Sequence, residues 1–397
     1  MSSSALASEE PAEPPLFTRD FALAVVAQLA FGFAFASFFL LPKYVVTALY
    51  GTPSQVGYVG GTAVVAAVLV SPWCGKLLDS GPRRPLLFVG ALLTALGALA
   101  FVGVTQIGWY LYAVRALQGA AYTLYFVAAA TYVADLSPAS RLGQALGWFG
   151  CAGLAMNAVA TLIAERIAQS VGWHGVFYTA AAAGAAGAVV TLFLREPPAK
   201  PKLAARSLLP SGSLPTSRSV VMFATVAAGA AFGALFTFTQ PLALSLGDTN
   251  MGPLFAGYTV MALGVRVFFG SAADRFGRAR VSGWALGFYS LVVAVTAGMG
   301  QGWLGVVGLG FGLAHGALYP SLNALALEGV EREQRGMVGA HFNAAFNAGT
   351  FLVTFCFGQI AQAYGYRVVF LLVACFSVSG SFLLWAQSRK SLLTRPS

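Results

Sequence analysis

The chain has 397 residues, of which 58% are hydrophobic and only 9% are charged, and its mean hydropathy is +0.75. This small number of polar side chains cannot cover the surface of a soluble domain of this size. The composition therefore predicts a membrane protein. The formal net charge of +10 would suit a nucleic-acid partner. The basic residues instead follow a membrane pattern, described below, which excludes that class.

The first nineteen residues differ from the rest of the chain. They are polar and rich in proline, and they carry Glu9, Glu10 and Glu13. A secretory signal would need a basic start and an apolar centre, and neither is present. Segment 1–19 is therefore expected to stay in the cytoplasm as a tail.

Twelve apolar runs follow, each near the roughly 20 residues that a helix needs to cross a bilayer. The first six lie at 21–42, 55–75, 85–105, 109–133, 142–164 and 173–194. The last six lie at 219–244, 253–273, 280–300, 303–326, 336–358 and 366–387. The sequence thus predicts an all-α membrane protein of twelve transmembrane helices. Its parts are a six-helix bundle at 20–194, a cytoplasmic linker rich in proline and basic residues at 195–218, a second bundle at 219–387 and a tail at 388–397.

The basic residues are distributed unevenly between the two sides of this arrangement. With an even number of spans, both ends of the chain and every second loop share one side. Nearly all loop lysines and arginines fall on that side, whereas the other side holds Lys43, Arg166 and Arg367. Because basic loops stay in the cytoplasm, the pattern predicts a bacterial inner-membrane protein with both termini in the cytoplasm.

The two halves of the chain match each other at an offset near 195 residues. Three pairs of segments correspond in the same order: Gly75–Asp79 with Gly270–Asp274, Gln118–Tyr122 with His315–Tyr319, and Ile167–Phe177 with Ile360–Phe370. One such match could arise by chance in a chain rich in glycine and alanine, but three in register could not. The repeat indicates a duplicated six-helix unit.

Two loops carry a short charged motif. The loop after the eighth run has the spacing G-x-x-x-D-R-x-G-R, formed by Gly270, Asp274, Arg275, Gly277 and Arg278. The loop after the second run keeps Gly75, Asp79, Arg83 and Arg84 but has Ser80 and Pro82 where the motif has Arg and Gly. Together with the six-plus-six organisation, these motifs resemble the major facilitator superfamily over essentially the whole chain. The loop pattern is most similar to the bacterial efflux permeases of that superfamily.

The resemblance implies two six-helix bundles around a central cavity and a gate formed by the motif. Asp79 would face the start of the eleventh span near Arg335, and Asp274 the start of the fifth span near Arg141. These contacts would hold the outward-facing state and break on inward opening. The alternative is that the short charged loops only enforce topology. Ser80 leaves open the pairing that its position would make.

The resemblance also implies that spans one, four, seven and ten line the cavity. Polar side chains in these spans are costly in lipid and are therefore functional candidates. In span four, one helical face carries Arg115, Gln118, Tyr122 and Tyr125. Arg115 and Gln118, with the glycine that follows, are similar to a family motif linked to proton coupling. Arg115 lies near the outer end of its span, however, and could instead extend to the membrane surface.

Span ten carries His315, Tyr319 and Asn323 on one face. Histidine titrates near physiological pH, so His315 is a candidate proton carrier, although it could simply bind a neighbouring helix. Gln28 of span one and Gln240 of span seven complete the candidate cavity residues. Both lie among phenylalanines, which suit an amphipathic solute but are also ordinary lipid-facing residues.

The charges within the spans indicate which charge the transported solute can carry. Every acidic residue lies in a loop or near a span end, so no carboxylate would attract a cation in the middle of the membrane. Arg115 would make the cavity neutral to positive, which favours anionic, zwitterionic or neutral solutes. Arg266 lies near the cytoplasmic end of span eight, close to Asp274, and is expected to anchor in the membrane interface.

Common catalytic and metal motifs are absent from the sequence. There is no G-x-x-x-x-G-K-[ST] phosphate loop, no H-E-x-x-H and no G-x-S-x-G, and the four cysteines show no ligand spacing. We therefore expect no enzyme activity, no catalytic residue, no metal site and no cofactor. An ion gradient would have to supply the energy for any transport.

These observations predict a monomeric secondary active transporter that works by alternating access. The favoured function is proton-coupled export of a small organic solute, such as a metabolite, a metal chelator or an antibiotic, and the partners would be that solute, protons and the lipid bilayer. Uptake of a sugar or organic acid, and a non-transporting sensor or scaffold, are the alternatives. Convergence of Arg115, Gln118, His315 and Tyr319 on one water-accessible space would favour transport, and their burial in helix contacts would favour a scaffold.

Overall fold

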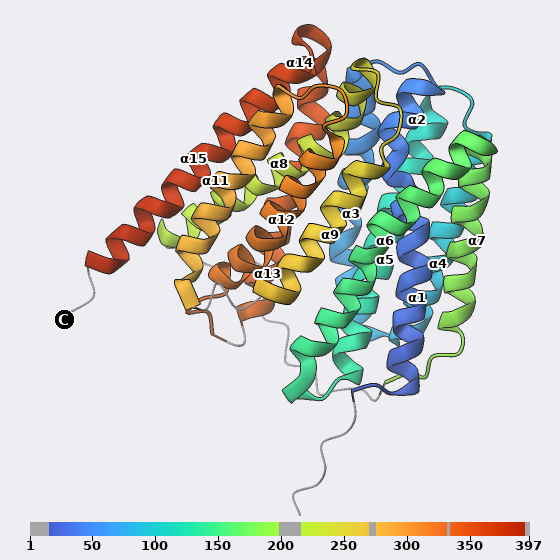
Figure 1. Cartoon of the computed structure of the whole chain (residues 1–397). Helices are drawn as coiled ribbons and strands as arrows, with labels where there is room; N and C mark the ends of the chain where they lie inside the picture. The colour runs from blue at the N-terminus through green and yellow to red at the C-terminus, as the bar shows by residue number, and fades with distance from the viewer. Residues whose placement is uncertain (1–15, 198–215, 270–274, 332–333, 394–397) are drawn as a thin grey trace, which may run out of the picture.

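The computed structural model describes residues 16–197, 216–269, 275–331 and 334–393, which form long helices joined by short connections (Figure 1). The helices run back and forth between two sides of the molecule, as the predicted spans require. We call the side at which α1 begins the proximal side and the opposite side the distal side. The proximal side is at the bottom of Figure 1.

The helices of the first half follow the first six predicted spans. In chain order they are α1 (Arg19–Ala36), the 3₁₀ turn η1 (Ser37–Leu40), α2 (Leu41–Thr47), α3 (Pro53–Ser80), α4 (Arg83–Ala100), η2 (Phe101–Gly103), α5 (Trp109–Leu136), η3 (Ala139–Arg141), α6 (Leu142–Ser170) and α7 (Trp173–Thr191). The first span is thus divided into α1, η1 and α2. Pro42 explains the break, because a proline has no N–H to continue the helical hydrogen bonds.

The second half follows the last six spans. Its helices are α8 (Thr216–Ser245), α9 (Gly252–Phe269), α11 (Arg278–Ala297), α12 (Leu304–Ala326), α13 (Arg335–Phe351), the π-helical segment η5 (Leu352–Cys356), α14 (Phe357–Tyr364) and α15 (Tyr366–Leu393). In the described residues of both halves, nine helical stretches are long and apolar enough to cross a membrane. The remaining three predicted spans correspond to α5, α7 and α12, which run beside them (Figure 1).

The internal repeat of the sequence reappears in the backbone. Gly172 precedes α7 with a φ of 90°, and Gly365 precedes α15 at the equivalent place with a φ of 85°. Glycine adopts this left-handed conformation at little cost, whereas other residues are strained there. Both halves therefore keep a glycine at this turn, directly before an aromatic residue.

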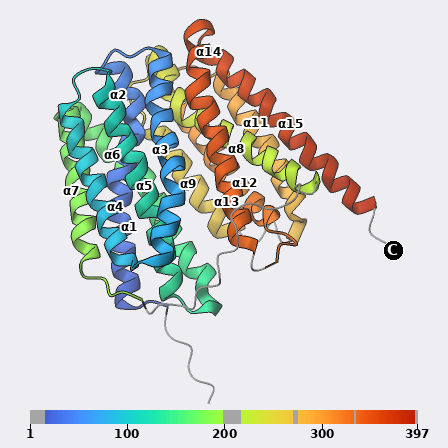
Figure 2. The same ribbon diagram turned by 180° about the vertical axis from the view of Figure 1, so that it is seen from behind.

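The helices of each half lie on their own side of the molecule, with α1 to α7 on one side and α8 to α15 on the other (Figures 1 and 2). The two halves meet along two seams. In one seam α6 packs against α9, and in the other α3 packs against α13, η5 and α14. These seams form the junction at which any movement between the halves would occur.

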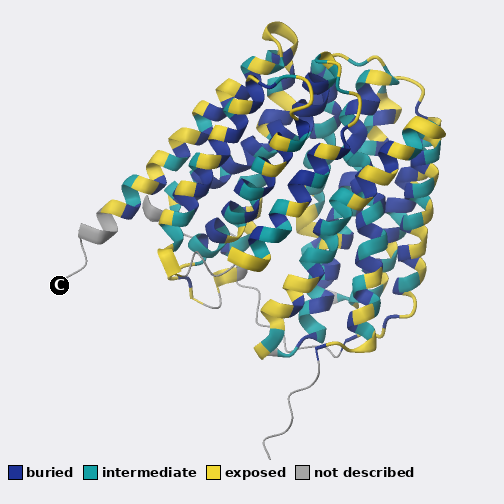
Figure 3. Cartoon of the chain, viewed as in Figure 1, coloured by how far each residue is buried: buried dark blue, intermediate teal, exposed yellow. Residues whose placement is uncertain are grey.

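Glycines allow close approach of helices within each half. A Cβ on Gly119 of α5 would lie 2.1 Å from the carbonyl oxygen of Ala63 in α3, and one on Gly312 of α12 would lie 2.2 Å from that of Tyr258 in α9. Close approach of small residues is a main source of helix association in lipid. Large apolar side chains such as Val260, Trp284 and Phe382 are exposed, as expected for helices that face lipid. Figure 3 shows exposed positions along the outer helices.

Candidate functional site

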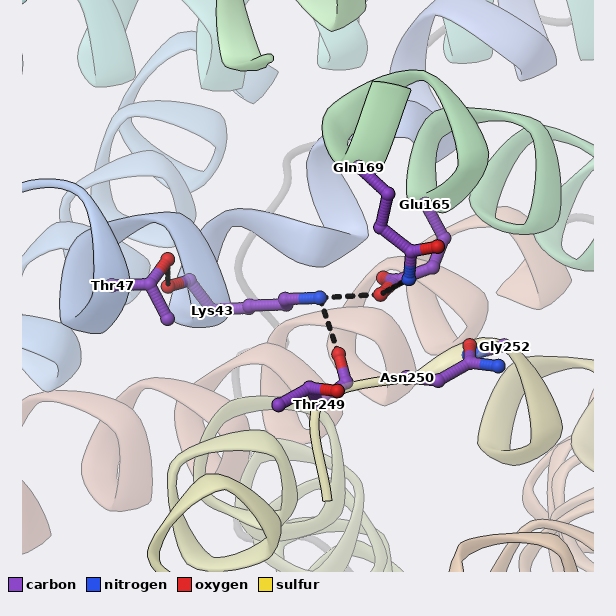
Figure 4. Close-up of polar contacts among 7 residues, drawn as sticks. All are labelled: Lys43, Thr47, Glu165, Gln169, Thr249, Asn250 and Gly252. Carbon is purple, nitrogen blue, oxygen red and sulfur yellow. Dashed lines mark hydrogen bonds and ion pairs between the residues drawn. The ribbon is translucent and has the colours of Figure 1, made fainter. Parts of the chain in front are cut away.

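A buried ion pair closes the distal side of the junction. Lys43 of α2 donates to the Glu165 carboxylate of α6 and to the backbone carbonyl of Thr249, in the connection between α8 and α9 (Figure 4). The Lys43 and Glu165 side chains are only 10% and 3% exposed. Gln169, one turn beyond Glu165, donates to the same carboxylate oxygen at 3.1 Å. Lys43 therefore links the two halves through a charge that is sheltered from solvent.

Next to this ion pair, toward the centre of the molecule, amide and aromatic contacts also join the two halves. Gln240 of α8 donates from Nε2 to the carbonyl oxygen of Phe39 in η1 at 2.7 Å. The Phe39 ring lies 4.9 Å from the Phe236 ring and 5.9 Å from the Phe255 ring, measured between centroids. Because Phe39 belongs to the first half and the other three residues to the second, this layer also joins the halves.

The seam between α3 and α14 is closed at the same side. Ser54 donates to Gln362, and Gln359 donates to the Tyr58 hydroxyl. A Cβ on Gly57 of α3 would lie 2.2 Å from the carbonyl oxygen of Thr354 in η5. The backbones of the two halves are thus in direct contact here.

The same helices are uncovered toward the proximal side. Among the described residues, no heavy atom would lie within 4 Å of a Cβ on Gly75 of α3 or on Gly147 of α6. Gly57 and Gly75 are eighteen residues apart, which is five helical turns, so they lie on the same face of α3. That face is therefore crowded at its distal end and free at its proximal end.

Arg115 and Gln118 lie between helices of the first half. Arg115 donates from Nη1 to Gln118 Oε1 at 2.6 Å and from Nε to the Val59 carbonyl oxygen of α3 at 3.2 Å. Gln118 is buried. Gln28 of α1 is buried as well and packs against Gly153 of α6. In this conformation, Arg115 and Gln118 hold α5 against α3.

His315 has the corresponding position in the second half. Its Nδ1 lies 2.9 Å from the Tyr258 hydroxyl of α9, and its Nε2 is buried without a hydrogen-bond partner among the described residues. Aromatic rings surround it, contributed by Phe232, Tyr258, Tyr289, Phe311, Tyr319 and Phe346. Tyr319 in turn donates to Asn343 of α13 at 3.1 Å, at an exposed position.

Two tyrosines face the centre from opposite halves. Tyr122 of α5 and Tyr319 of α12 lie within electrostatic range of each other. Tyr122 stacks on Phe35 of α1 at 4.4 Å between ring centroids, while the buried Tyr125 stacks on Phe31 at 3.7 Å.

The candidate cavity residues therefore fall into local groups. Arg115 contacts Gln118, and His315 contacts Tyr319, which lies near Tyr122. No contact recorded for the described residues joins Arg115 to His315. Asn323, one turn beyond Tyr319, has a buried Oδ1 with no hydrogen-bond partner among the described residues.

Two arginines of the first loop motif fasten helix ends together. Arg83 Nε pairs with Asp135 Oδ2, near the end of α5, at 3.1 Å, and Arg84 donates to the Leu192 carbonyl oxygen after α7. The backbone N–H groups of both arginines donate to Glu196. Arg83 and Arg84 thereby hold the start of α4 to its neighbours within the first half.

The rest of the motif is described only in part. The Asp79 side chain and all of Gly270 and Asp274 lie outside the described residues. Arg275 is exposed, and Gly277 precedes Arg278, the first residue of α11, with a φ of 90°. The gate expected from Asp79 and Asp274 therefore stays a prediction.

The sequence analysis did not identify the Lys43–Glu165 pair. The two residues are 122 positions apart, and each lies near a span end, where isolated charges are ordinary. A signal was present in the charge distribution. Lys43 is a basic residue on the side that otherwise lacks them, and Glu165 is an acid at the same membrane level.

Comparison with known proteins identifies the family. The sequence model of the Major Facilitator Superfamily matches residues 23–265 and 221–396. The chain belongs to the major facilitator superfamily. It is therefore a membrane transporter, as the two loop motifs and the repeat predicted.

Individual relatives agree with this membership of the superfamily. The multidrug resistance protein MdtG of Proteus mirabilis is 25% identical over 335 residues, covering 81% of this chain and 83% of its own. The crystal structure of a mutant of the nucleoside transporter NupG superposes with a TM-score of 0.75 at 18% identity, covering 92% of this chain and 98% of that one. The peptide-transporter-family structure of PepTSo gives a TM-score of 0.76 at 12% identity, covering 96% and 100%. At these identities the two structures show a shared fold.

Proposed function

We propose that this transporter works by alternating access, with 20–194 and 219–387 acting as two six-helix bundles around a central path. The observation that carries the proposal is the asymmetry of the junction. Its distal side is closed by Lys43, Gln240 and Gly57, whereas the proximal faces of α3 and α6 are uncovered. A glycine face without a neighbour in this state can pack closely in a second one.

The proposal assigns the proximal side to the cytoplasm, with both termini and the 195–218 linker there. Arg83, Arg84, Arg141 and Arg195 lie at proximal helix ends, which supports this orientation by the positive-inside rule. The structure then corresponds to an inward-open state. The gate proposed for Asp79 and Asp274 would form only in the opposite, outward-open state.

We propose that the following residues form the walls of the path and their support: Gln28, Arg115, Gln118, Tyr122, Tyr125, Gln240, His315, Tyr319 and Asn323. Arg115 does not contact His315 in this state, because Gln118 and Val59 bind it within the first half. Tyr122 and Tyr319, which belong to opposite halves, would line the path deeper than its proximal opening.

Export driven by protons is the proposed direction and coupling. The names of the MdtG relatives, which are called multidrug resistance proteins, support export. The buried His315 Nε2, which has no hydrogen-bond partner among the described residues, is the atom proposed to carry the coupling proton. The solute would be a small anionic, zwitterionic or neutral organic molecule.

Transport and coupling can be measured together in proteoliposomes that contain a pH-sensitive dye. Organic anions, metal chelators and cationic dyes would be added outside without an imposed gradient, with protein-free liposomes as the control. Antiport predicts that entry of a transported solute drives protons out and raises the internal pH. A fall in internal pH would instead establish symport and contradict export by antiport.

His315→Gln separates coupling from transport in the same assay. Because glutamine keeps a polar side chain but cannot take up the proton, we expect the pH change to be lost. Exchange of labelled for unlabelled solute should persist, since it needs no net proton movement. Unchanged proton movement in this variant would remove His315 from the coupling mechanism.

A further inference from the structure

Arg266 lies at the junction between the two halves. It occupies the last turn of α9, and its Nη1 is 3.8 Å from the position that a Cβ on Gly150 of α6 would take. Gly150 has no side chain, so the guanidinium faces bare helix backbone of the other half. The sequence analysis expected the Arg266 side chain to anchor in the membrane interface near Asp274. In the structure this side chain instead extends across the seam between α9 and α6.

The positive charge of Arg266 is not neutralised by the described part of the chain. Its Nε is buried and has no hydrogen-bond partner there. The ion pairs formed by the described residues are Lys43 with Glu165 and Arg83 with Asp135. The Arg266 side chain as a whole is half-buried, so Nε is its one buried donor without a partner among the described residues, and such a donor favours binding of an anion. The planar guanidinium matches a carboxylate, which it can bind with two parallel hydrogen bonds.

Arg115, the other arginine within a span, is not available in the same way. Its Nε and Nη1 already donate to Val59 and Gln118 inside the first half. Releasing them would break the link between α5 and α3. Of the two arginines, Arg266 is the one that combines an open hydrogen-bonding site with a place at the junction.

Aromatic side chains lie deeper along the side of α9 that carries Arg266. Tyr258 lies eight residues earlier, on the same face of α9 and about 12 Å away at 1.5 Å per residue. Tyr258 contacts His315 of α12, whose Nδ1 lies 2.9 Å from the Tyr258 hydroxyl. The His315 ring is 5.0 Å from Phe232 and 5.7 Å from Tyr319, measured between centroids. The Arg266 cation therefore lies proximal to a group of aromatic side chains formed by Tyr258, Phe232 and Tyr319 around His315.

We propose that Arg266 binds the carboxylate of an aromatic organic anion, whose ring packs toward His315 and Tyr319. The inference rests on the proposed transport function, since it identifies the solute class of the same path. The anion would enter from the open proximal side, reach Arg266 first and place its ring deeper between the halves. On outward opening it would be released beyond Lys43.

Binding to the purified full-length protein tests this inference without requiring transport. The probes are 1-naphthoate and its neutral counterpart 1-naphthamide, which share the ring but differ in charge. Wild type should bind the carboxylate roughly tenfold or more tightly than the amide, as expected for a charged hydrogen-bonded pair. Arg266→Gln should abolish this preference and leave the affinity for the amide within about twofold, which also shows that the variant is folded.

Two further variants sharpen the result. Arg280→Gln removes an exposed arginine of α11, lying on a groove between α11 and α12, and should behave as wild type. Equal affinity of wild type for both probes, or a preference that survives in Arg266→Gln, would overturn the inference. So would loss of the preference in Arg115→Gln but not in Arg266→Gln. If Arg266 carries the preference but no solute crosses the membrane, the inference stands and the proposed transport function fails.

Discussion

Lys43→Met is expected to lower the thermal unfolding midpoint of the purified protein by several degrees. The change leaves the Glu165 carboxylate buried without its cation, and breaking a buried pair in this way costs about 3–5 kcal/mol. It also removes the link to the Thr249 carbonyl, so the distal side should open more often. Thermal unfolding followed by tryptophan fluorescence measures the first effect.

Two controls separate this effect from a general loss of charge. Arg166→Met removes an exposed cation from the residue next to Glu165 and should leave the midpoint nearly unchanged. The double variant Lys43→Met with Glu165→Met should recover much of the lost stability, because no charge is then left unpaired. If Lys43→Met were as stable as Arg166→Met, the pair would not contribute to the closed distal side.

Gly57→Ala and Gly75→Ala are expected to shift the conformational equilibrium in opposite directions. At Gly57 the new Cβ would lie 2.2 Å from the Thr354 carbonyl oxygen, so α3 must move away from η5. Overpacking of this kind costs about 1–3 kcal/mol, and each 1.4 kcal/mol changes a population ratio by about tenfold. Gly57→Ala should therefore favour opening of the distal side.

At Gly75 the new methyl group has no neighbour within 4 Å among the described residues in this state, and alanine is a better helix former than glycine. We expect Gly75→Ala to leave the inward-open state intact and to hinder the closing of its proximal side. Reactivity of single cysteines at the distal and proximal ends of α3 toward an impermeant maleimide reports both shifts. A shift in the same direction for both variants would contradict the proposed movement of the two halves.

The sequence predicted the helices well because a bilayer places strict requirements on any helix that spans it. A span must be long and apolar, and loops must carry their basic residues on the correct side, so α3 to α9 and α11 to α15 lie where the apolar runs do. The matching segments Ile167–Phe177 and Ile360–Phe370 contain Gly172 and Gly365, and both glycines have a left-handed backbone in the structure. The π-helical segment Leu352–Cys356 was not predicted, as no proline or special spacing marks it.

Side-chain partners were harder to predict than spans. Arg115 and Arg266 look alike in sequence, each a single arginine within an apolar run. The structure gives Arg115 two acceptors inside the first half and directs Arg266 across the junction. The difference depends on which helix face meets which neighbour, and that is fixed by long-range packing. The Lys43–Glu165 pair was missed for the same reason.

The most direct measurement is a pair of spin-label distances between the two halves, recorded with and without a transported solute and a pH gradient. One pair joins Tyr50 to Tyr364 at the distal side, and the other joins Leu77 of α3 to Ala340 of α13 at the proximal side, after replacement of the four native cysteines. Alternating access predicts that the distal distance lengthens as the proximal distance shortens. Distances that stay fixed, or that change together in the same direction, would contradict it.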